Sequence, residues 1–404
     1  MFDELEKHGI PMRWDDGEPY WIPYAPLGLP LAKISLRVHW QNVKPQLAAA
    51  VRKCGVRVLE RTMVIDLLTN ERAVVGATML NTRTGAYVVI KSKVTVIAAG
   101  PLYRCYDPET PVPGKYKMRY HYCPSTISGD GWAAAYRAGA ELVNMDSTAW
   151  TFRIRDDLTI SFGNFRLNEG IPMKCLTWKG EEIANPTPSS YFELEQKGET
   201  PIYFSLEHLP DDFHKRIERA YVHERPISFK IAEDKGYNPR KHRYELNAKS
   251  LGIKWWGGIY INEHCKASLE GLFAVGDSAA GISACAFSAA SGLVVGDTID
   301  TYVKEAGKPV VDEGQVESHK KAAMAPLKVK DGAEPSEFEA SIRYICERYV
   351  DNFKSEGKLL EGLRRLGTLR RVWMPKLTAK NPHHQMRCLE NRNILDLAKE
   401  GQPP

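Results

Sequence analysis

The residues best suited to chemistry lie between Gly271 and Thr298, in the run GLFAVGDSAAGISACAFSAASGLVVGDT. An apolar stretch of strand type, Leu272 to Val275, ends at Gly276 and Asp277, and a small-residue loop then leads into a helix that we expect to begin near Ser288. Small side chains let backbone N–H groups approach a ligand, and the positive end of a helix favours negative charge. We therefore predict a site for a polar cofactor. Its predicted contacts are Gly276, Asp277, Ser288, Ala289 and Ser291. The alternative is a tightly packed strand–turn–helix in which the aspartate only caps.

Two other turns carry residues of the same kind. The continuous apolar run Val94 to Ala98 is typical of a buried parallel strand and ends at Gly100. The sequence Ser128-Gly129-Asp130-Gly131 opens a helix of small residues that reaches Ala140. We predict that Gly100 and Asp130 also contact the cofactor. An N-cap role on a buried, alanine-rich helix is the alternative for Asp130.

The elements between these turns would position them. Val43 to Cys54 predicts an amphipathic helix, and Val56 to Leu59 predicts a strand after it. A three-stranded meander follows, predicted over Met63 to Leu68, Ala73 to Asn81 and Ala86 to Ser92. Helix, strand, meander and return strand form the middle of a flavin- or dinucleotide-binding domain. A meander crossover favours two-dinucleotide-type flavoproteins over simple dehydrogenases.

This order of elements predicts an α/β fold, α+β overall. We expect a partial Rossmann-like FAD-binding domain with a β-meander crossover, in residues 1–146 and 251–305. Residues 147–250 are aromatic and Pro-punctuated and are predicted to form an inserted α+β capping domain that holds the substrate. Residues 306–404 are predicted to form a C-terminal helical domain, whose helices cover Ser336 to Lys354, Gly357 to Arg371 and Met386 to Lys399. Residues 1–40 are expected to be irregular.

Composition excludes several classes of function. The chain has 404 residues, and 43% hydrophobic and 26% charged residues are ordinary for a soluble globular protein. A net charge of +5 is too weak to argue for nucleic acid. The eight cysteines form no C-x-x-C, so no iron–sulfur or other metal site is expected on this chain, and reduced thiols indicate the cytoplasm. The sequence shows neither a membrane-spanning apolar run nor a signal peptide.

One expected motif is missing. The fingerprint G-x-G-x-x-G, which holds the pyrophosphate of a dinucleotide, does not occur in the sequence. We therefore expect that the sequence is a fragment or a truncated relative, or that another polypeptide supplies the first βαβ unit. Its absence weighs against FAD binding by this chain alone.

Three landmarks in order resemble the flavoprotein subunits of the fumarate reductase, succinate dehydrogenase and adenylylsulfate reductase family. They are VIAAG at Val96 to Gly100, SGDGWAAAYRAGAEL at Ser128 to Leu142 and GLFAVGDSAAG at Gly271 to Gly281. Within the family, EKHGIPMRWDDGEPYW, FRLNEG, WKGEE and AFSAASG resemble the alpha subunit of adenylylsulfate reductase. The resemblance implies an FAD-dependent oxidoreductase with its isoalloxazine ring against Ser288 to Ser291.

Departures from the family argue against dicarboxylate chemistry. Where dicarboxylate-handling relatives carry His-Pro-Thr, this chain has Ala149-Trp150-Thr151-Phe152, and where they carry His-Tyr-x-Met-Gly-Gly it has Ile253-Lys254-Trp255-Trp256-Gly257-Gly258. Their arginine before the flavin loop is also absent, because Ile282 to Phe287 contains no basic residue. A dicarboxylate site needs such cationic and imidazole donors.

The resemblance also implies substrate residues. Arg166, in FRLNEG, corresponds to an arginine that faces the flavin, and it is the predicted catalytic and anion-binding residue; an ordinary surface arginine is the alternative. Trp255 and Trp256 are predicted to stack on an aromatic substrate or on the flavin, with Lys254 as an anion partner, although such a pair also suits core packing.

A partner is implied as well. Two-electron chemistry at flavin N5 would exchange electrons with an iron–sulfur, ferredoxin-like subunit, because this chain carries no cluster motif. The basic segment LRRLGTLRRVWMPK, Leu363 to Lys376, could dock an acidic partner of this kind or could be a solvated helix. Two alternatives remain open: a fumarate-reductase-like enzyme acting on another activated double bond, and a truncated, non-catalytic docking subunit.

Overall fold

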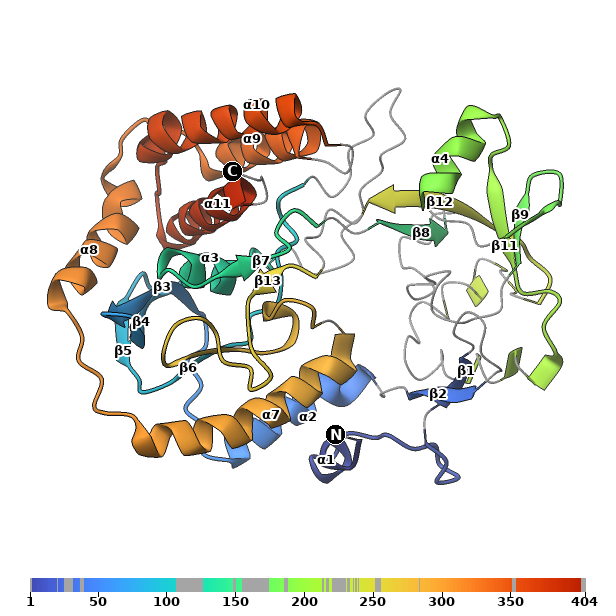
Figure 1. The fold of residues 1–404 in the computed structure, drawn as a ribbon, viewed down its shortest axis with the longest axis horizontal. Coiled ribbons are helices and arrows are strands. Elements are labelled where there is room, and N and C mark those ends of the chain that lie inside the picture. The colour runs from blue at the N-terminus through green and yellow to red at the C-terminus, as the bar shows by residue number, and fades with distance from the viewer. Residues whose placement is uncertain are drawn as a thin grey trace. The chain divides into compact units, whose positions relative to one another are not determined.

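The described part of the chain forms two compact units. The computed structural model describes residues 2–19, 21–24, 32–36, 40–106, 126–147, 150–154, 174–184, 188–212, 214–215, 218–219, 230, 233–234, 236, 238, 240–250, 256–282, 284–350 and 354–400. One unit comprises residues 1–58 and 150–250, and the other comprises residues 59–149 and 251–404. Figure 1 shows the elements of both units.

The first unit is built on an antiparallel sheet of order β10-β9-β11-β12-β8. The rings of Phe204 and Tyr244 lie opposite each other on neighbouring strands and stack at 4.8 Å, and both residues are buried. Its helices and strands are α1 (Phe2–Lys7), β1 (Trp21–Tyr24), β2 (Ala32–Leu36), α2 (Trp40–Lys53), β8 (Trp150–Ile154), β9 (Lys174–Thr177), β10 (Glu182–Ile183), α4 (Pro188–Gln196), β11 (Ile202–Ser205) and β12 (Tyr244–Ser250).

The strands of the second unit form three small sheets. A meander has the order β3-β4-β5, β14 pairs with β6 in parallel, and β13 pairs with β7 in antiparallel fashion. These strands are β3 (Thr62–Asn70), β4 (Ala73–Asn81), β5 (Tyr87–Lys91), β6 (Thr95–Ile97), β7 (Leu142–Val143), β13 (Gly258–Ile259) and β14 (Leu272–Ala274). The parallel pair puts the ends of β6 and β14 at one edge.

The helices of the second unit share one hydrophobic core with these strands. Buried side chains of α3, β14, α9 and α11 belong to the same cluster, including Trp132, Leu272, Ile342 and Ile394. Figure 1 shows α9, α10 and α11 gathered beside α3. The helices are α3 (Asp130–Arg137), η1 (Gly276–Ser278), α7 (Ala284–Glu305), α8 (Glu313–Met324), η2 (Ala325–Lys328), α9 (Pro335–Tyr349), α10 (Glu356–Thr368), η3 (Leu369–Trp373), η4 (Met374–Lys376) and α11 (Pro382–Glu400).

Two buried ion-pair networks fix α11 in this core. Asp66 of β3 pairs with Arg137 and with Arg392, whose Nη1 lies 2.9 Å from Asp66 Oδ2. Arg104 pairs with Glu339 at 2.6 Å and with Glu390 at 2.8 Å, and all three side chains are at most 7% exposed. Because an unpaired charge at such depth is costly, each network requires its partners in place.

Most of the predicted elements are confirmed. The meander, the strand before Gly100, the strand before Gly276 and the C-terminal helices are all present. The first 40 residues are not wholly irregular, because α1, β1 and β2 lie in them. The fold is the mixed α and β architecture expected of the flavin-binding class.

Two local predictions are wrong. Val56 to Leu59 forms no strand, because a strand needs a neighbour and none of the described segments pairs with this one. The helix expected to begin near Ser288 begins at Ala284, so Ser288 lies in its second turn. The small residues that suggested a loop include alanines, which are the strongest helix formers.

Candidate functional site

The short helix η1 is the point where the predicted cofactor turns meet. Ser278 is fully buried, and its Oγ accepts a hydrogen bond from Gly100 N at 2.9 Å and donates one to Gly100 O at 3.3 Å. Trp132 Nε1 of α3 donates to Ser278 O at 2.8 Å. The turn after β6, the turn after β14 and the start of α3 are therefore held together by one serine.

Gly276 and Ser291 join this turn to α7. Gly276 N donates to Ser291 Oγ at 3.0 Å, and Ser291 Oγ donates to Ser288 O at 2.9 Å. Gly276 has φ of +57°, and a Cβ there would lie 3.2 Å from Ser288 Oγ. The position favours glycine, and the Ser291 hydroxyl is committed to holding the turn.

A glycine pair closes the other side of the turn. At Gly258 a Cβ would lie 2.9 Å from Ser278 O and 3.0 Å from Ala280 N, and φ there is +151°. At Gly257 a Cβ would lie 2.7 Å from Asn144 O. The backbone of β13 can approach η1 this closely only without side chains. The shape of the turn at η1 therefore depends on contacts with the turn after β6, with α7 and with β13.

Asp130 lies at the start of α3 beside this junction. Gly129, not Asp130, is the N-cap of the helix, so the capping alternative is wrong in detail. Asp130 Oδ2 accepts a hydrogen bond from Ser128 Oγ at 2.9 Å, and Oδ1 accepts one from Asn393 Nδ2 at 2.6 Å. Burial raises the pKa of Asp130, opposed by the hydrogen bond from Asn393. A carboxyl with a raised pKa next to small residues is a candidate cofactor contact.

The rim of the junction is small and partly open. Asp277, Ser288 and Ala289 are half-buried, and Ala99 at the end of β6 is exposed. Trp256 is 51% exposed, and its carbonyl accepts a hydrogen bond from Gly281 N at 3.2 Å. The structure thus places Trp256 beside the bend, with its ring available for stacking rather than in the core.

Three predicted substrate residues cannot be placed. Arg166, Lys254 and Trp255 lie outside the described residues. Their roles remain predictions.

These residues fit the isoalloxazine half of a flavin. A glycine turn that a Cβ would fill, half-exposed small residues and a neighbouring indole make a flat, accessible rim. The sequence contributes no G-x-G-x-x-G turn for the pyrophosphate half. The fit is therefore to part of the cofactor.

A cavity of about 590 Å³ opens beside β6, within the second unit. Its walls are mostly apolar and come from the start of β3, from β4, from β6 and from α3. Two carboxyl groups, those of Asp130 and Glu390, also line it. The remaining lining residues include Leu59, Arg61, Met63, Val64, Leu67, Ala77, Met79, Val96, Ala98, Ala134 and Met386.

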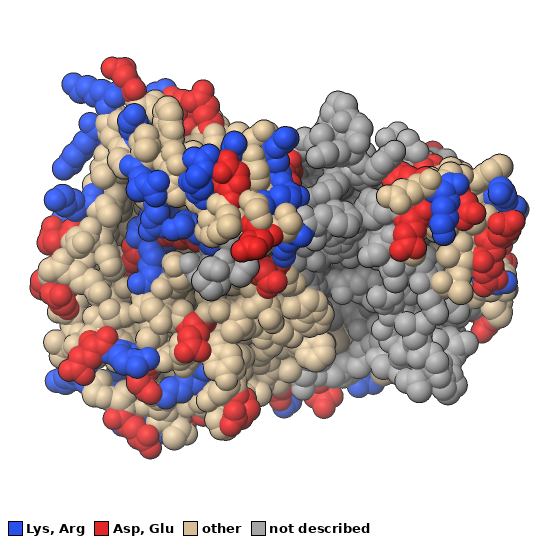
Figure 2. Space-filling view, turned by 45° about the horizontal axis from the view of Figure 1, so that its top comes forward, with Lys and Arg blue, Asp and Glu red and all other residues tan. Residues whose placement is uncertain are grey.

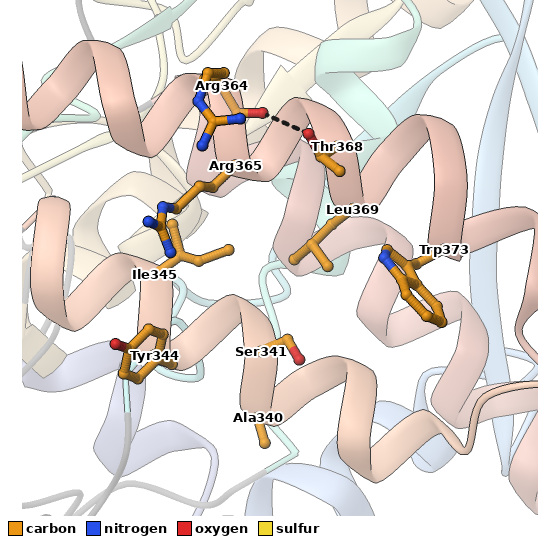
Figure 3. A pocket seen from close by; sticks show the side chains of 9 residues that line it. All are labelled: Ala340, Ser341, Tyr344, Ile345, Arg364, Arg365, Thr368, Leu369 and Trp373. Atoms are coloured by element: carbon orange, nitrogen blue, oxygen red, sulfur yellow. Dashed lines mark hydrogen bonds between the residues drawn. The ribbon is translucent and has the colours of Figure 1, made fainter.

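A second hollow, of about 560 Å³, lies between α9 and α10. Figure 3 shows Tyr344 and Ile345 of α9 facing Arg364, Arg365 and Leu369, with Trp373 at one end. Glu361 forms ion pairs with Arg364 at 2.7 Å and with Arg365 at 2.6 Å. These arginines lower the pKa of Glu361 to about 2.

Two arginines of the basic segment beside this hollow are therefore paired with an acidic side chain. Arg370 is also paired, with Asp396. Figure 2 shows acidic side chains among the basic ones on the face that it displays. The segment Leu363 to Lys376 contains only basic charges, and Glu361 is the partly exposed acid that pairs with it, near exposed Trp373 and Tyr344.

Three residues of the junction were missed by the sequence analysis. Ser278 directly follows Gly276-Asp277, so its position in the motif could have indicated it. Trp132 lies two residues after Asp130, where a buried indole N–H always needs an acceptor. Asn393 is 263 residues away from Asp130 in the chain, and no local signal marks it.

Comparison with known proteins finds relatives among FAD-dependent proteins. Residues 1–156 match the family model described as FAD binding domain. An uncharacterised FAD-dependent oxidoreductase of Methanocaldococcus jannaschii is 24% identical over 243 residues, which cover 56% of this chain and 41% of the relative. The L-aspartate oxidase of Vibrio cholerae is 24% identical over 252 residues, covering 55% and 42%. The chain therefore spans less than half the length of these curated relatives.

Solved structures share the fold over nearly the whole chain. Adenylylsulfate reductase from Archaeoglobus fulgidus superposes with a TM-score of 0.77 at 19% identity, covering 99% of this chain and 72% of that chain. The E. coli quinol fumarate reductase superposes with a TM-score of 0.72 at 16% identity, covering 98% and 72%. Among the described residues, every helix is too short or too polar to cross a membrane.

Proposed function

We propose that this chain, whose first 156 residues match the FAD binding domain family, is the flavin-carrying subunit of an FAD-dependent oxidoreductase similar to the alpha subunit of adenylylsulfate reductase. The junction at Ser278 carries the proposal. It joins the ends of β6 and β14, the start of α3 and, through Gly276 and Ser291, α7. The same residues leave an open rim of glycine, alanine and serine.

The chain's own groups have separate tasks at this rim. Gly276 and Gly100, both with positive φ, add no side chains at the turn and so leave room for the ring. Helix α7 runs for 22 residues from Ala284, and its positive end favours negative charge on the ring. Trp256 can cover the ring or stack on an aromatic substrate. When bound, FAD would supply two-electron exchange at its N5 position.

The proposed partner is an iron–sulfur subunit of ferredoxin type, in the cytoplasm. The support is the resemblance of the sequence and the absence of a C-x-x-C pair among the eight cysteines. The exposed Trp373 and Tyr344 near the basic segment favour a docking contact that combines aromatic burial with attraction to an acidic partner. Arg166 and Lys254 are the proposed anion contacts of the substrate.

A flavin-binding measurement tests this proposal. The purified chain, with a G-x-G-x-x-G polypeptide present, is incubated with FAD, and quenching of the flavin fluorescence gives the affinity. Ser278→Ala removes the group that holds the Gly100 backbone, and we expect about tenfold weaker binding.

Ser341→Ala is the matched control, because its hydroxyl donates to Glu337 O on the outer side of α9, away from the junction. It should bind FAD as the unmodified chain does. Equal affinity for the two serine variants, or no flavin uptake at all, contradicts the proposed site.

The substrate class is tested by reoxidation. Reduced holoprotein is titrated with adenylylsulfate or with fumarate, and oxidised holoprotein with sulfite plus AMP, while the flavin absorbance is followed. We expect a response to the sulfur substrates and none to fumarate, because the donors that clamp dicarboxylates are missing from the sequence. A response to fumarate alone would favour the alternative enzyme.

A further inference from the structure

Strand β6 has hydrogen-bonding groups on an edge that no described strand covers. Within the described residues it pairs only with β14. Thr95 N donates to Gly271 O at 2.8 Å, and Ile97 O accepts from Val275 N at 3.0 Å. Backbone groups alternate along a strand, so those of Val96 and Ala98 face the other edge. An open edge of this kind is a template for another strand.

The side chains of β6 are also less covered than the sequence of the strand predicts. The run Val94 to Ala98 is apolar apart from Thr95, as is typical of a parallel strand covered on both faces. Yet Val96 is 36% exposed, and Ala98 is exposed. Leu59, in a segment whose sequence predicts a strand but which pairs with nothing described, is also 36% exposed.

The cavity beside β6 lies at this open edge. Val96 and Ala98 line it together with Leu59, and its volume is about 590 Å³. Asp130 and Glu390 contribute carboxyl groups to its wall and Arg61 contributes a guanidinium, so a pyrophosphate or another anion would meet one cationic group against two carboxyl groups there. Apolar side chains with backbone donors and acceptors suit the cavity better.

We propose that the open edge of β6 and this cavity receive a parallel β-strand, followed by a glycine turn and a helix, from a polypeptide segment not contained in residues 1–404. The added strand would pair with the backbone of Val96 and Ala98, and its side chains would fill the cavity. The occupant is identified by the site: parallel pairing continues the β14–β6 sheet, and the G-x-G-x-x-G turn is the element that the sequence lacks. This inference rests on the proposed function.

Hydrogen exchange tests the docking without any flavin. The probe is a synthetic polypeptide of about 30 residues with an apolar strand, a G-x-G-x-x-G turn and an amphipathic helix. The control probe carries a proline in the middle of the strand, which removes a ladder hydrogen bond. We expect the probe, and not its control, to slow amide exchange at Val96 and Ala98 by about tenfold or more.

Paired variants identify the surface. Val96→Lys places a charge on the open edge and should weaken probe binding by about tenfold. Val89→Lys is the matched control, because Val89 is 37% exposed on the edge strand β5 and does not line the cavity. Its affinity for the probe should equal that of the unmodified chain. Circular dichroism of both variants verifies that each is folded.

Three results would overturn the docking proposal. The first is a finding that, in the chain alone, the β6 amides are already protected from hydrogen exchange as well as those of β14. The second is equal probe binding by the two lysine variants, and the third is concentration-dependent dimerisation that Val96→Lys abolishes, which would assign the edge to a second copy. Docking without subsequent FAD uptake would leave this inference standing and refute the proposed function. FAD uptake that does not depend on the probe would refute this inference and leave the proposed function standing.

Discussion

Strands β6 and β14 are neighbours in one parallel sheet and read alike in the sequence, but they differ in burial. Leu272, Phe273 and Ala274 of β14 are each 0% exposed, whereas Val96 of β6 is 36% exposed. Both runs are apolar without alternation, the pattern of a strand covered on both faces. The difference teaches that an apolar run predicts a strand suited to burial on both faces. It does not predict which covering contacts the described residues supply, and the structure shows that they cover β14 more completely than β6.

The largest expected effect is on β14, the strand that is fully buried. Phe273 is fully buried, and its ring lies edge-on to Tyr302 at 5.6 Å. Phe273→Ala should lower the free energy of unfolding by about 3–5 kcal/mol, because it leaves a cavity in a packed core. Urea denaturation followed by circular dichroism measures it. A loss below about 1 kcal/mol would mean that β14 is no more tightly packed than β6.

The turn after β14 should be nearly as sensitive. Gly258→Ala places a methyl group against Ser278 O and Ala280 N, at a φ that side chains rarely adopt, and should cost about 1–3 kcal/mol of unfolding free energy. Gly357→Ala is the control, since nothing lies near that position in α10, and it should be neutral or stabilising. Equal denaturation midpoints for the two variants would show that η1 shifts to accommodate the added methyl group without a loss of stability.

Asp130, on the wall of the open cavity, should make stability depend on pH. Burial raises its pKa in the folded protein above the usual value, so the folded state binds this proton more tightly than the unfolded state. Stability is then lost as pH rises from the usual aspartate range through the raised pKa. Asp130→Asn, which carries no charge, should lack this loss.

The measurement is the difference in unfolding free energy between Asp130→Asn and the unmodified chain across a pH series. The variant should gain relative stability as pH rises. Ser128, Asn393, Glu390 and Arg104 all act on this carboxyl, and they are the same in both proteins. A difference that stays constant with pH would contradict the raised pKa.

The smallest expected effect is on the open strand. Val96→Ala should change the free energy of unfolding of the chain alone by less than about 1 kcal/mol, because the side chain is already partly in water. In the presence of the strand–turn–helix probe the same substitution should cost more. An equal cost with and without the probe would remove the reason for calling β6 open.

Much of the fold follows from local pattern. Runs of β-type residues separated by turn residues predict β3, β4 and β5, and two largely apolar runs ending in glycine predict β6 and β14. The predicted start of α7 is too late because the small residues before Ser288 favour a loop only as a class, whereas the alanines among them favour helix. Val56 to Leu59 was predicted as a strand on propensity, which cannot supply a partner.

The contacts of the site also divide into those that local sequence predicts and those that it does not. Gly276 and Ser291 follow from motif spacing, and they contact each other as neighbours in one strand–turn–helix. The contacts to Asp130 from Asn393 and to Arg104 from Glu339 join residues more than 200 positions apart. Such contacts depend on packing of the whole unit, so a single sequence does not specify them. What the sequence lacks, the G-x-G-x-x-G turn, proved as informative as what it contains.

The hydrogen bond from Asn393 to Asp130 has a practical consequence for anyone shortening this protein. Helix α11 belongs to the tail of the chain and would be an obvious piece to trim for expression or crystallisation. Yet Asn393 of this helix bonds to Asp130 in the first turn of α3, Arg392 pairs with Asp66 of the meander, and Glu390 pairs with Arg104 in the segment that follows β6. A shortened version that ends before Pro382 would leave Asp130, Asp66 and Arg104 with fewer partners, whereas a tag placed after Glu400 would keep the contacts.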